Sequence, residues 1–296
     1  MENIAANQLQ QYPCPVCGST TNRPVHTIRQ FPIVQCVPCT MVFVNPRLKT
    51  EFVYNIYKDH YFNRPSDGYD NYTLTAHLRI KTFEKWYVQI KKFCASAKGQ
   101  ALDIGCAAGY FLDILKKDHW QTEGIELDTT MHADLLNRSY QAFNQPIETF
   151  TPTHSYDLIT LFDVIEHLPN LQADIKKLHD MLNPGGMVAL VTPNVTSTQR
   201  KLFGKRWFQF KPLEHIYYFS PATMRLLAEK NGFSVTTIQP CGQFADISFL
   251  QNRLHKYGFK TIARLFGAIT TMLGIRHTSW YADTGSMFVI LQKQQP

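Results

Sequence analysis

The 296 residues of this sequence show neither the pattern expected of an export signal nor that expected of a membrane-spanning segment. The first residues, MENIAANQLQQYP, have no positively charged flank that leads into an apolar run, so they do not resemble a signal peptide. No uninterrupted apolar run reaches about 18 residues, and the nearest one, TIARLFGAITTMLGI, is short and contains Arg264. We therefore expect a cytoplasmic protein, not one that is secreted or crosses a membrane.

Charged residues are scarce, at 18% of the chain, and acidic residues are scarcer than basic ones, with 23 Asp and Glu against 30 Lys and Arg. The net charge of +7 favours acidic partners such as phosphates, nucleic acid or an anionic membrane. The excess is local, because residues 195–218 and residues 241–296 each carry a net +4. A chain that is 44% apolar and 13% aromatic is not expected to be disordered.

The seven cysteines do not suit a disulfide framework, since four of them have the spacing of metal ligands and an odd number remains. Cys14 and Cys17 lie in CPVCG, and Cys36 and Cys39 lie in CVPCT. Two such pairs can form a closed tetrahedral shell of thiolates, which is typical of a structural Zn²⁺ site. Because a segment of about 40 residues buries little apolar area alone, the metal would supply its folding energy. The alternative is four unrelated buried cysteines. Whether this zinc ribbon contacts the main domain or a substrate stays open.

A strand, a turn of small residues and a helix follow one another at residues 100–117. Residues 100–104 (QALDI) predict the strand, residues 105–109 (GCAAG) the turn, and FLDILKK the helix, which is how nucleotide-binding α/β domains begin. The dehydrogenase fingerprint would need glycines where this chain has Ala107 and Tyr110, and the GK[ST] phosphate loop is absent. Glu126 ends the next strand-like run, where an acid can accept hydrogen bonds from ribose hydroxyls.

Five blocks of sequence in the order of the family resemble the class I S-adenosylmethionine-dependent methyltransferases. They are LDIGCAAGYFL, GIE, YDLITLFDVIEHL, LNPGGMVALVTPN and HIYYFSPATMRLLAEKNGF. Ala107 departs from the glycine that the family often has there. The chain is more similar still to a bacterial branch with a four-cysteine zinc ribbon at the N-terminus and a tyrosine-rich linker, and this similarity implies enzymes that act on carbohydrate or other secondary-metabolite precursors.

The resemblance implies an α/β fold, a doubly wound and mostly parallel seven-stranded sheet of the Rossmann-like methyltransferase type. We expect a zinc ribbon at residues 1–48, a tyrosine-rich helical linker or lid at 49–98, and the methyltransferase domain at 99–296. A basic amphipathic insertion is expected at about 241–280, and MFVILQK (287–293) is expected to be the last buried strand.

The resemblance also assigns roles to residues around the cofactor, S-adenosylmethionine. Asp103 would organise the turn and the ammonium group, Glu126 would hold the ribose, and Phe162 would line the adenine or sulfonium pocket. Within the turn, the backbone would approach the ligand at Gly105, Cys106, Ala107 and Gly109. The alternatives are that Asp103 only accepts hydrogen bonds from the turn's amides and that Phe162 only packs in the core.

Candidate catalytic residues lie in DVIEH and after it. Asp163, Glu166 and His167 are spaced i, i+3 and i+4, so on a helical turn they would face one way, and His215 follows Glu214 downstream. Three hypotheses stay open for the histidine pair: a general base or acceptor-orienting pair, a second divalent-metal site, and a structural hydrogen-bonded pair. The metal hypothesis comes from a resemblance to small-RNA 2′-O-methyltransferases and quinone-pathway O-methyltransferases, from which the shorter Asp163 departs.

Segments outside the core motifs would shape the acceptor site. The region before the first core strand is rich in tyrosine and could form a lid or pack the ribbon, at Tyr54, Tyr57, Tyr61, Tyr69 and Tyr72. The basic and aromatic loop at 195–218 could bind phosphate or a nucleic-acid backbone, or be a solvated insertion. A basic helix at 250–273 could lie on a membrane surface, cover a lipid-linked substrate, or pack on its own domain.

We predict an S-adenosylmethionine-dependent methyltransferase that acts on a small, negatively charged acceptor, sugar-like or hydroxylated, with O-methylation favoured. The acceptor could be phosphate-, nucleotide- or lipid-linked, and the oligomeric state is open. One alternative is an RNA methyltransferase that uses the ribbon and the basic loop. Another is a cofactor- or partner-binding protein without catalysis.

Overall fold

The computed structural model describes residues 5–57, 75–94, 99–248 and 278–294, together with six positions between 251 and 270. Three of the expected lid tyrosines, Tyr61, Tyr69 and Tyr72, lie outside the described residues, as does most of the expected basic helix at 250–273. None of the helices in the described ranges is both long enough and apolar enough to cross a membrane.

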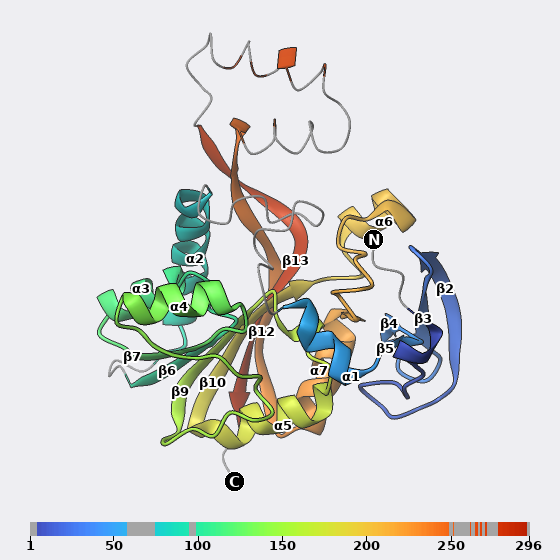
Figure 1. Ribbon diagram of the computed structural model, residues 1–296, viewed down its shortest axis with the longest axis horizontal. Helices are drawn as coiled ribbons and strands as arrows, with labels where there is room; N and C mark the ends of the chain where they lie inside the picture. The colour runs from blue at the N-terminus through green and yellow to red at the C-terminus, as the bar shows by residue number, and fades with distance from the viewer. Residues whose placement is uncertain are drawn as a thin grey trace.

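A seven-stranded sheet forms the centre of the molecule (Figure 1), in the order β12-β13-β10-β9-β6-β7-β8. Its strands are β6 (Gln100–Ile104), β7 (Gln121–Ile125), β8 (Gln141–Phe143), β9 (Tyr156–Phe162), β10 (Leu182–Pro193), β12 (Phe233–Asp246) and β13 (Ser279–Lys293). Strands β8, β7, β6, β9 and β10 are parallel, whereas β13 runs antiparallel to both of its neighbours. The predicted fold class is confirmed, and the final buried strand lies within β13.

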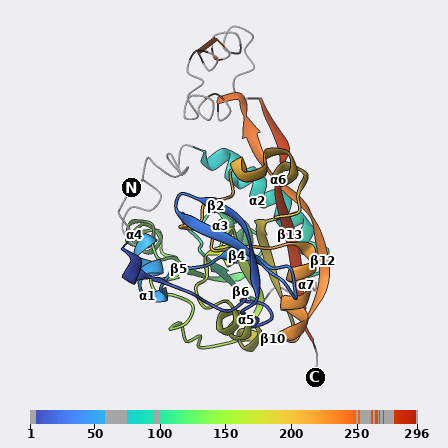
Figure 2. The ribbon, with the colours of Figure 1, turned by 90° about the vertical axis from the view of Figure 1, so that its right-hand side faces the viewer.

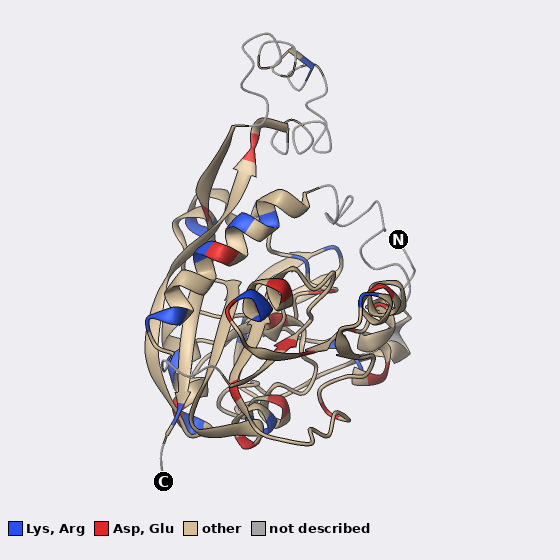
Figure 3. Cartoon of the chain, turned by 90° about the vertical axis from the view of Figure 1, so that its left-hand side faces the viewer, with Lys and Arg blue, Asp and Glu red and all other residues tan. Residues whose placement is uncertain are grey.

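Helices cover both faces of this sheet because strand side chains alternate between two apolar layers. On one face, Trp86 and Phe111 pack with strand residues such as Ala189, and on the other Ile175 and Leu227 pack with Leu190. The first layer holds α2 (Ala76–Lys91) and α3 (Tyr110–Lys117), and the second holds α5 (Leu171–Met181) and α7 (Pro221–Lys230). The short helix α4 (Thr129–Asn137) follows β7 and packs near α3 through Leu135. The outer side of α2 carries several Lys and Arg residues (Figure 3).

The ribbon joins the main domain through a shared sheet (Figure 2). The ribbon's own strands are β1 (Leu9–Gln10), β2 (Asn22–Ile28), β3 (Phe31–Cys36), β4 (Val42–Val44) and β5 (Arg47–Leu48). Of these, β1 and β5 pair with each other, and β2, β3 and β4 belong to the shared sheet. The short strand β11 (Tyr217–Tyr218) comes from the main domain and pairs with β4, so that Tyr217 lies opposite Phe43 and Tyr218 opposite Val42. The ribbon therefore docks on the main domain, which was one of the two open possibilities.

Short helical segments connect these parts. They are α1 (Thr50–Val53) and η2 (Tyr54–Ile56) after the ribbon, η4 (Ile165–His167) after β9, and α6 (Thr198–Phe203) and η5 (Gly204–Arg206) after β10. Strand β12 continues to Asp246, so the segment between the last two strands begins later than the expected residue 241. The β12–β13 pair extends beyond the main body of the sheet (Figure 1).

Candidate cofactor and acceptor site

The turn between β6 and α3 is built from residues with left-handed backbone conformations. Gly105, Ala107 and Gly109 have φ values of 73°, 46° and 76°. A side chain at Gly105 would place its Cβ 2.6 Å from Cγ2 of Val164, which follows β9, so only glycine fits this close approach. Ala107 adopts the left-handed region despite its Cβ, which costs about 1 kcal/mol. The turn therefore brings backbone groups to the carboxyl edge of the sheet at an energetic cost, as a ligand-binding turn does.

Two buried carboxyl groups flank this turn. Glu126 accepts hydrogen bonds from the backbone N–H of Ala107 and of Asp128, both at 2.8 Å. Asp103 accepts one from Oγ1 of Thr160 at 2.6 Å. Burial raises the pKa of Asp103 and the pKa of Glu126 to about 7 each, and in Asp103 the neighbouring Glu126 charge adds to this rise. The two acids are therefore poised to change charge near neutral pH when a cationic or hydroxylated ligand arrives.

Cys106 and Phe162 lie in packed surroundings. The Cys106 side chain packs with Leu112 and Leu135, so in this conformation only its backbone belongs to the turn. Phe162 lies 4.8 Å from Phe111 and 5.0 Å from Trp86 between ring centroids, and it remains only partly buried. Phe162 therefore packs in an aromatic cluster on the α2 and α3 face, and its contact with a cofactor stays a prediction.

The second group of polar side chains follows β9. Glu166, His167 and His215 offer ligand atoms that all lie within 4.8 Å of one another, and the two imidazole centroids are 4.8 Å apart. Asp163 differs from the expectation, because its carboxylate is not part of this cluster. The residue precedes the single 3₁₀ turn η4 and has a φ of 55°, so the i, i+3, i+4 geometry of an α-helix does not apply. Its Oδ2 lies 3.5 Å from Nε2 of Gln243 instead.

Hydrogen bonds fix the orientation of both histidines. Nδ1 of His167 lies 3.0 Å from the carbonyl oxygen of Glu214, and Nδ1 of His215 lies 2.9 Å from that of Gln209. A carbonyl oxygen only accepts, so Nδ1 of His215 carries the proton and its Nε2 keeps a lone pair, whereas Nδ1 of His167 also lies 2.8 Å from the Tyr57 hydroxyl, which can either donate or accept. In Glu166, Oε2 accepts from Oγ1 of Thr192 at 2.9 Å, whereas Oε1 is buried without a hydrogen-bond partner among the described residues.

The charges of this cluster are strongly shifted by its surroundings. Burial, together with the Lys211 charge, lowers the pKa of His167 to about 3. Burial also lowers the pKa of His215 well below its ordinary value, while it raises the pKa of Glu166 well above its ordinary value. Both imidazoles are therefore neutral at pH 7, the form in which histidine acts as a metal ligand.

Three further residues complete the site: the sequence suggested no role for Thr160 or Thr192, whereas Tyr57 was one of the tyrosines expected in a lid. Thr160 and Thr192 donate to Asp103 and Glu166, and the Tyr57 hydroxyl lies 2.8 Å from Nδ1 of His167. The two threonines had a detectable signal, since each is a polar residue within a run of apolar strand residues, LITLF (158–162) and MVALVTP (187–193). Tyr57 had none beyond its place in the tyrosine-rich segment.

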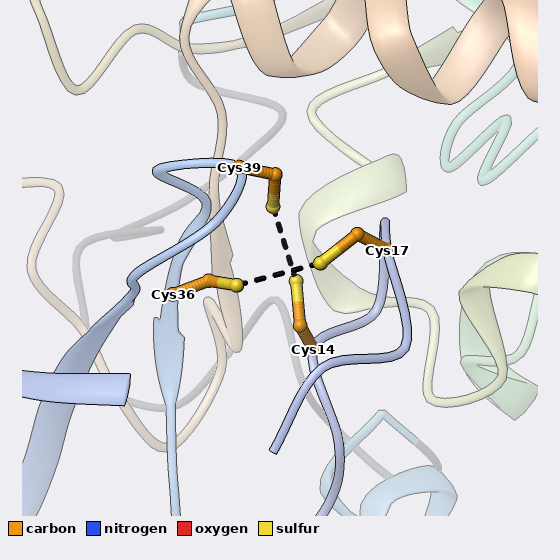
Figure 4. Close-up of side chains that lie close together, drawn as sticks. All are labelled: Cys14, Cys17, Cys36 and Cys39. Atoms are coloured by element: carbon orange, nitrogen blue, oxygen red, sulfur yellow. Dashed lines mark hydrogen bonds between the residues drawn. The ribbon is translucent and has the colours of Figure 1, made fainter. Parts of the chain in front are cut away.

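The four ribbon cysteines converge on one point (Figure 4). Sγ of Cys14 lies 3.4 Å from that of Cys39, and Sγ of Cys17 lies 3.4 Å from that of Cys36, with all four within 4.8 Å. Sulfur atoms bound to one Zn²⁺ at about 2.3 Å lie about 3.8 Å apart, so the four thiols fit a closed tetrahedral zinc site.

Comparison with known proteins supports the same fold. A sequence model described as a methyltransferase domain matches residues 78–238, which is more than half of the chain. The chain is similar to a ubiquinone biosynthesis O-methyltransferase of Albidiferax ferrireducens, 26% identical over 114 residues, which cover 36% of this chain and 45% of the relative. A protein of the same name from Shewanella halifaxensis is 24% identical over 145 residues, or 44% of this chain and 61% of the relative. The chain thus spans about half the length of the curated relatives that it matches.

Solved structures resemble the chain at low sequence identity. A SAM-dependent methyltransferase from Archaeoglobus fulgidus is 18% identical with a TM-score of 0.51, and the match covers 76% of this chain and all of the other. A putative sarcosine dimethylglycine methyltransferase from Galdieria sulphuraria is 15% identical, with a TM-score of 0.51 and coverage of 73% and 86%. Together with the strand order and the residues of the turn, these matches show that the chain belongs to the methyltransferase-domain family of class I, S-adenosylmethionine-dependent methyltransferases.

Proposed function

We propose that the protein transfers a methyl group from S-adenosylmethionine to a hydroxyl group of a small acceptor. The observation that carries this proposal is the buried pair of acids, Asp103 and Glu126, beside a left-handed turn at the carboxyl edge of the sheet. Ligands bind at this edge in open α/β folds. Support for a hydroxyl acceptor comes from the curated relatives, which are named O-methyltransferases.

The residues around the turn fit the cofactor. When bound, S-adenosylmethionine supplies an electrophilic methyl group on a sulfonium. Both oxygens of Glu126 accept one backbone N–H each and retain lone pairs that can accept hydrogen bonds from two ribose hydroxyls. Asp103, tied to Thr160, presents a second acid that favours a cationic ammonium group once it is ionised. These residues would bind and orient the cofactor, since methyl transfer depends mainly on position.

On the acceptor side, we propose that Glu166, His167 and His215 hold a divalent cation. Both imidazoles have Nδ1 within hydrogen-bond distance of a carbonyl oxygen, and one oxygen of the Glu166 carboxyl group accepts from Thr192, which are the outer hydrogen bonds that metal ligands usually show. A bound cation would also favour the ionised form of Glu166, whose pKa burial raises well above its ordinary value. Such an ion acts as a Lewis acid, which would orient the acceptor hydroxyl and favour loss of its proton. The low pKa of His167 disfavours the general-base hypothesis, because the ring would hold a proton too weakly at neutral pH.

Native mass spectrometry of the full chain tests the cofactor and both metal sites together. We expect one Zn²⁺ that Cys14→Ser removes, a cofactor adduct that Glu126→Ala removes, and a second divalent ion that His215→Ala removes. His179→Ala is the matched control, since that histidine lies on α5 away from the cluster. Release of S-adenosylhomocysteine, measured with catechols and with sugars as acceptors, then tests the transfer itself.

The outcomes separate the parts of the proposal. Cofactor binding without a second ion would refute the metal site and return His167 and His215 to the base or structural hypothesis. Absence of a cofactor adduct under conditions where Zn²⁺ is bound would refute the proposed activity. Transfer to RNA at a higher rate than to any small acceptor would refute the acceptor class.

A further inference from the structure

Helix α6 and the residues that follow turn η5 expose large apolar side chains. Leu202, Phe203 and Phe208 are 77%, 52% and 44% exposed. The described part of the chain exposes nine such side chains, and three of them fall within residues 202–208. A cluster of this kind marks an interaction surface more often than scattered single residues do.

The same segment is firmly held, so these side chains are not exposed because the loop lacks packing. Trp207 and Phe210 are buried, with ring centroids 5.2 Å apart, and Phe210 lies 4.9 Å from Tyr218 of β11. Ser197 caps α6 by accepting from the backbone N–H of Arg200. The exposed side chains of Leu202, Phe203 and Phe208, which we call the apolar face, therefore belong to a segment that the buried rings of Trp207 and Phe210 hold in place.

Positive charge surrounds this apolar face. Lys201, Lys205 and Arg206 are exposed beside it, and residues 195–213 contain no Asp or Glu. A partly buried fourth cation, Arg200, places its guanidinium 3.0 Å from Nε2 of His26 in the ribbon. An apolar centre with cations at its edge complements an anionic lipid surface, in which apolar side chains enter the acyl boundary and cations face the phosphates.

The surface adjoins the candidate acceptor site. It begins just after β10 ends at Pro193, on the carboxyl edge of the parallel strands, and the carbonyl group of Gln209 orients His215. In Figure 1, α6 projects at the same end of the molecule as the β12–β13 pair. A protein attached through this surface would have its candidate acceptor site close to the membrane.

We propose that residues 198–208 dock on an anionic lipid bilayer, with Leu202, Phe203 and Phe208 in the interface and the three exposed cations against lipid phosphates. A second copy of the chain is a poor occupant, because two equally basic surfaces repel one another. Phe203 and Phe208 could stack on bases, but Leu202, the most exposed of the three apolar side chains, could not, whereas a lipid interface accommodates all three, so the bilayer is the better occupant. The proposal does not depend on methyl transfer.

Sedimentation of the full chain with vesicles tests this surface. We expect binding to phosphatidylcholine vesicles that contain phosphatidylglycerol, and weak binding to phosphatidylcholine alone. The double variant Leu202→Ser, Phe203→Ser should weaken binding at least tenfold, since both apolar anchors are lost. Lys201→Glu with Lys205→Glu should weaken it by more than the roughly fivefold expected for each lost cation. Leu136→Ser, at a site on α4 that is 50% exposed, is the matched control and should bind like the unmodified protein.

Three results would overturn the proposal. The first is equal binding to neutral and anionic vesicles, or binding that the Leu202 and Phe203 substitutions leave unchanged. The second is a dimer in light scattering that these substitutions convert to a monomer, which would assign the face to a second copy. The third is tighter binding to single-stranded RNA than to anionic vesicles. Retained cofactor binding in each variant shows that its fold is intact.

Discussion

Cofactor affinity should rise with pH through about 7, because Asp103 and Glu126 both change charge there. Burial raises their pKa values to about 7, and each is no more than 5% exposed. Only the ionised forms attract the cofactor's ammonium group and accept fully from its ribose hydroxyls. One pH unit below the pKa, each group is about one-tenth ionised, which corresponds to about 1.36 kcal/mol of binding free energy for each carboxylate that must be charged.

The expected dissociation constant is therefore about tenfold weaker at pH 6 than on the plateau if one ionised acid is required, and about a hundredfold weaker if both are. Isothermal titration calorimetry between pH 5 and 7.5 measures this, in a range where an α-amino group stays mostly protonated. Asp103→Asn removes one titrating group, so log Kd should fall less steeply with rising pH, by up to one log unit per pH unit.

Acid unfolding should not account for the weaker cofactor binding at low pH, because the two acids change folding stability in the opposite direction. Both acids have pKa values in the folded state that are higher than in the unfolded chain. They therefore stabilise the fold below about pH 4, and this contribution is lost as the pH rises through about 7. Acid would thus weaken cofactor binding while these two groups favour folding. A flat affinity from pH 5 to 7.5 would refute the reasoning, and so would a hundredfold change that Asp103→Asn leaves unaltered, since a change of that size requires both acids.

Three other predictions concern the ribbon, a glycine of β7 that lies against the turn, and a buried acid. Cys14→Ser should release the Zn²⁺ and loosen the ribbon, seen as loss of zinc on gel filtration, whereas Cys94→Ser should keep it. Gly124→Ala should destabilise the protein by about 1 to 3 kcal/mol, because the new Cβ would lie 2.6 Å from Sγ of Cys106. Adding Cys106→Ala should restore much of the melting temperature, and no rescue would contradict the clash. Burial raises the pKa of Asp174 to about 8, so Asp174→Asn should stabilise the protein at pH 9 and have little effect at pH 6 in urea titrations; equal effects at both pH values would argue against it.

Local patterns in the sequence were sufficient for much of the fold. The strand, turn and helix at residues 100–117 predict the start of an α/β domain, the resemblance of five sequence blocks to class I methyltransferases implies the doubly wound sheet, and the GCAAG turn with Glu126 predicts its ligand-binding edge. Two C-x2-C pairs predict a metal site because each pair spans only one tight turn, and so its geometry hardly depends on distant parts of the chain. The final strand at 287–293 was predicted from its continuous apolar run, although β13 begins earlier, at Ser279.

The composition of the acceptor site depended on contacts between distant segments. Periodicity grouped Asp163 with Glu166 and His167, but the left-handed backbone at Asp163 and the short η4 turn separate it from them. His215 joins the cluster from about fifty residues away through a loop held by Trp207 and Phe210.

The sequence by itself determined the family and, through that resemblance, the doubly wound sheet. It also predicts the cofactor turn and the four zinc ligands, because these depend on the spacing of residues that are close together in the chain. Only the tertiary structure decided that β11 docks the ribbon on the main domain and that Glu166, His167 and His215 converge. It also decided which aromatics of the basic loop are buried and which are exposed. The physical reason is that these features arise from packing between segments far apart in the chain, which no local pattern encodes.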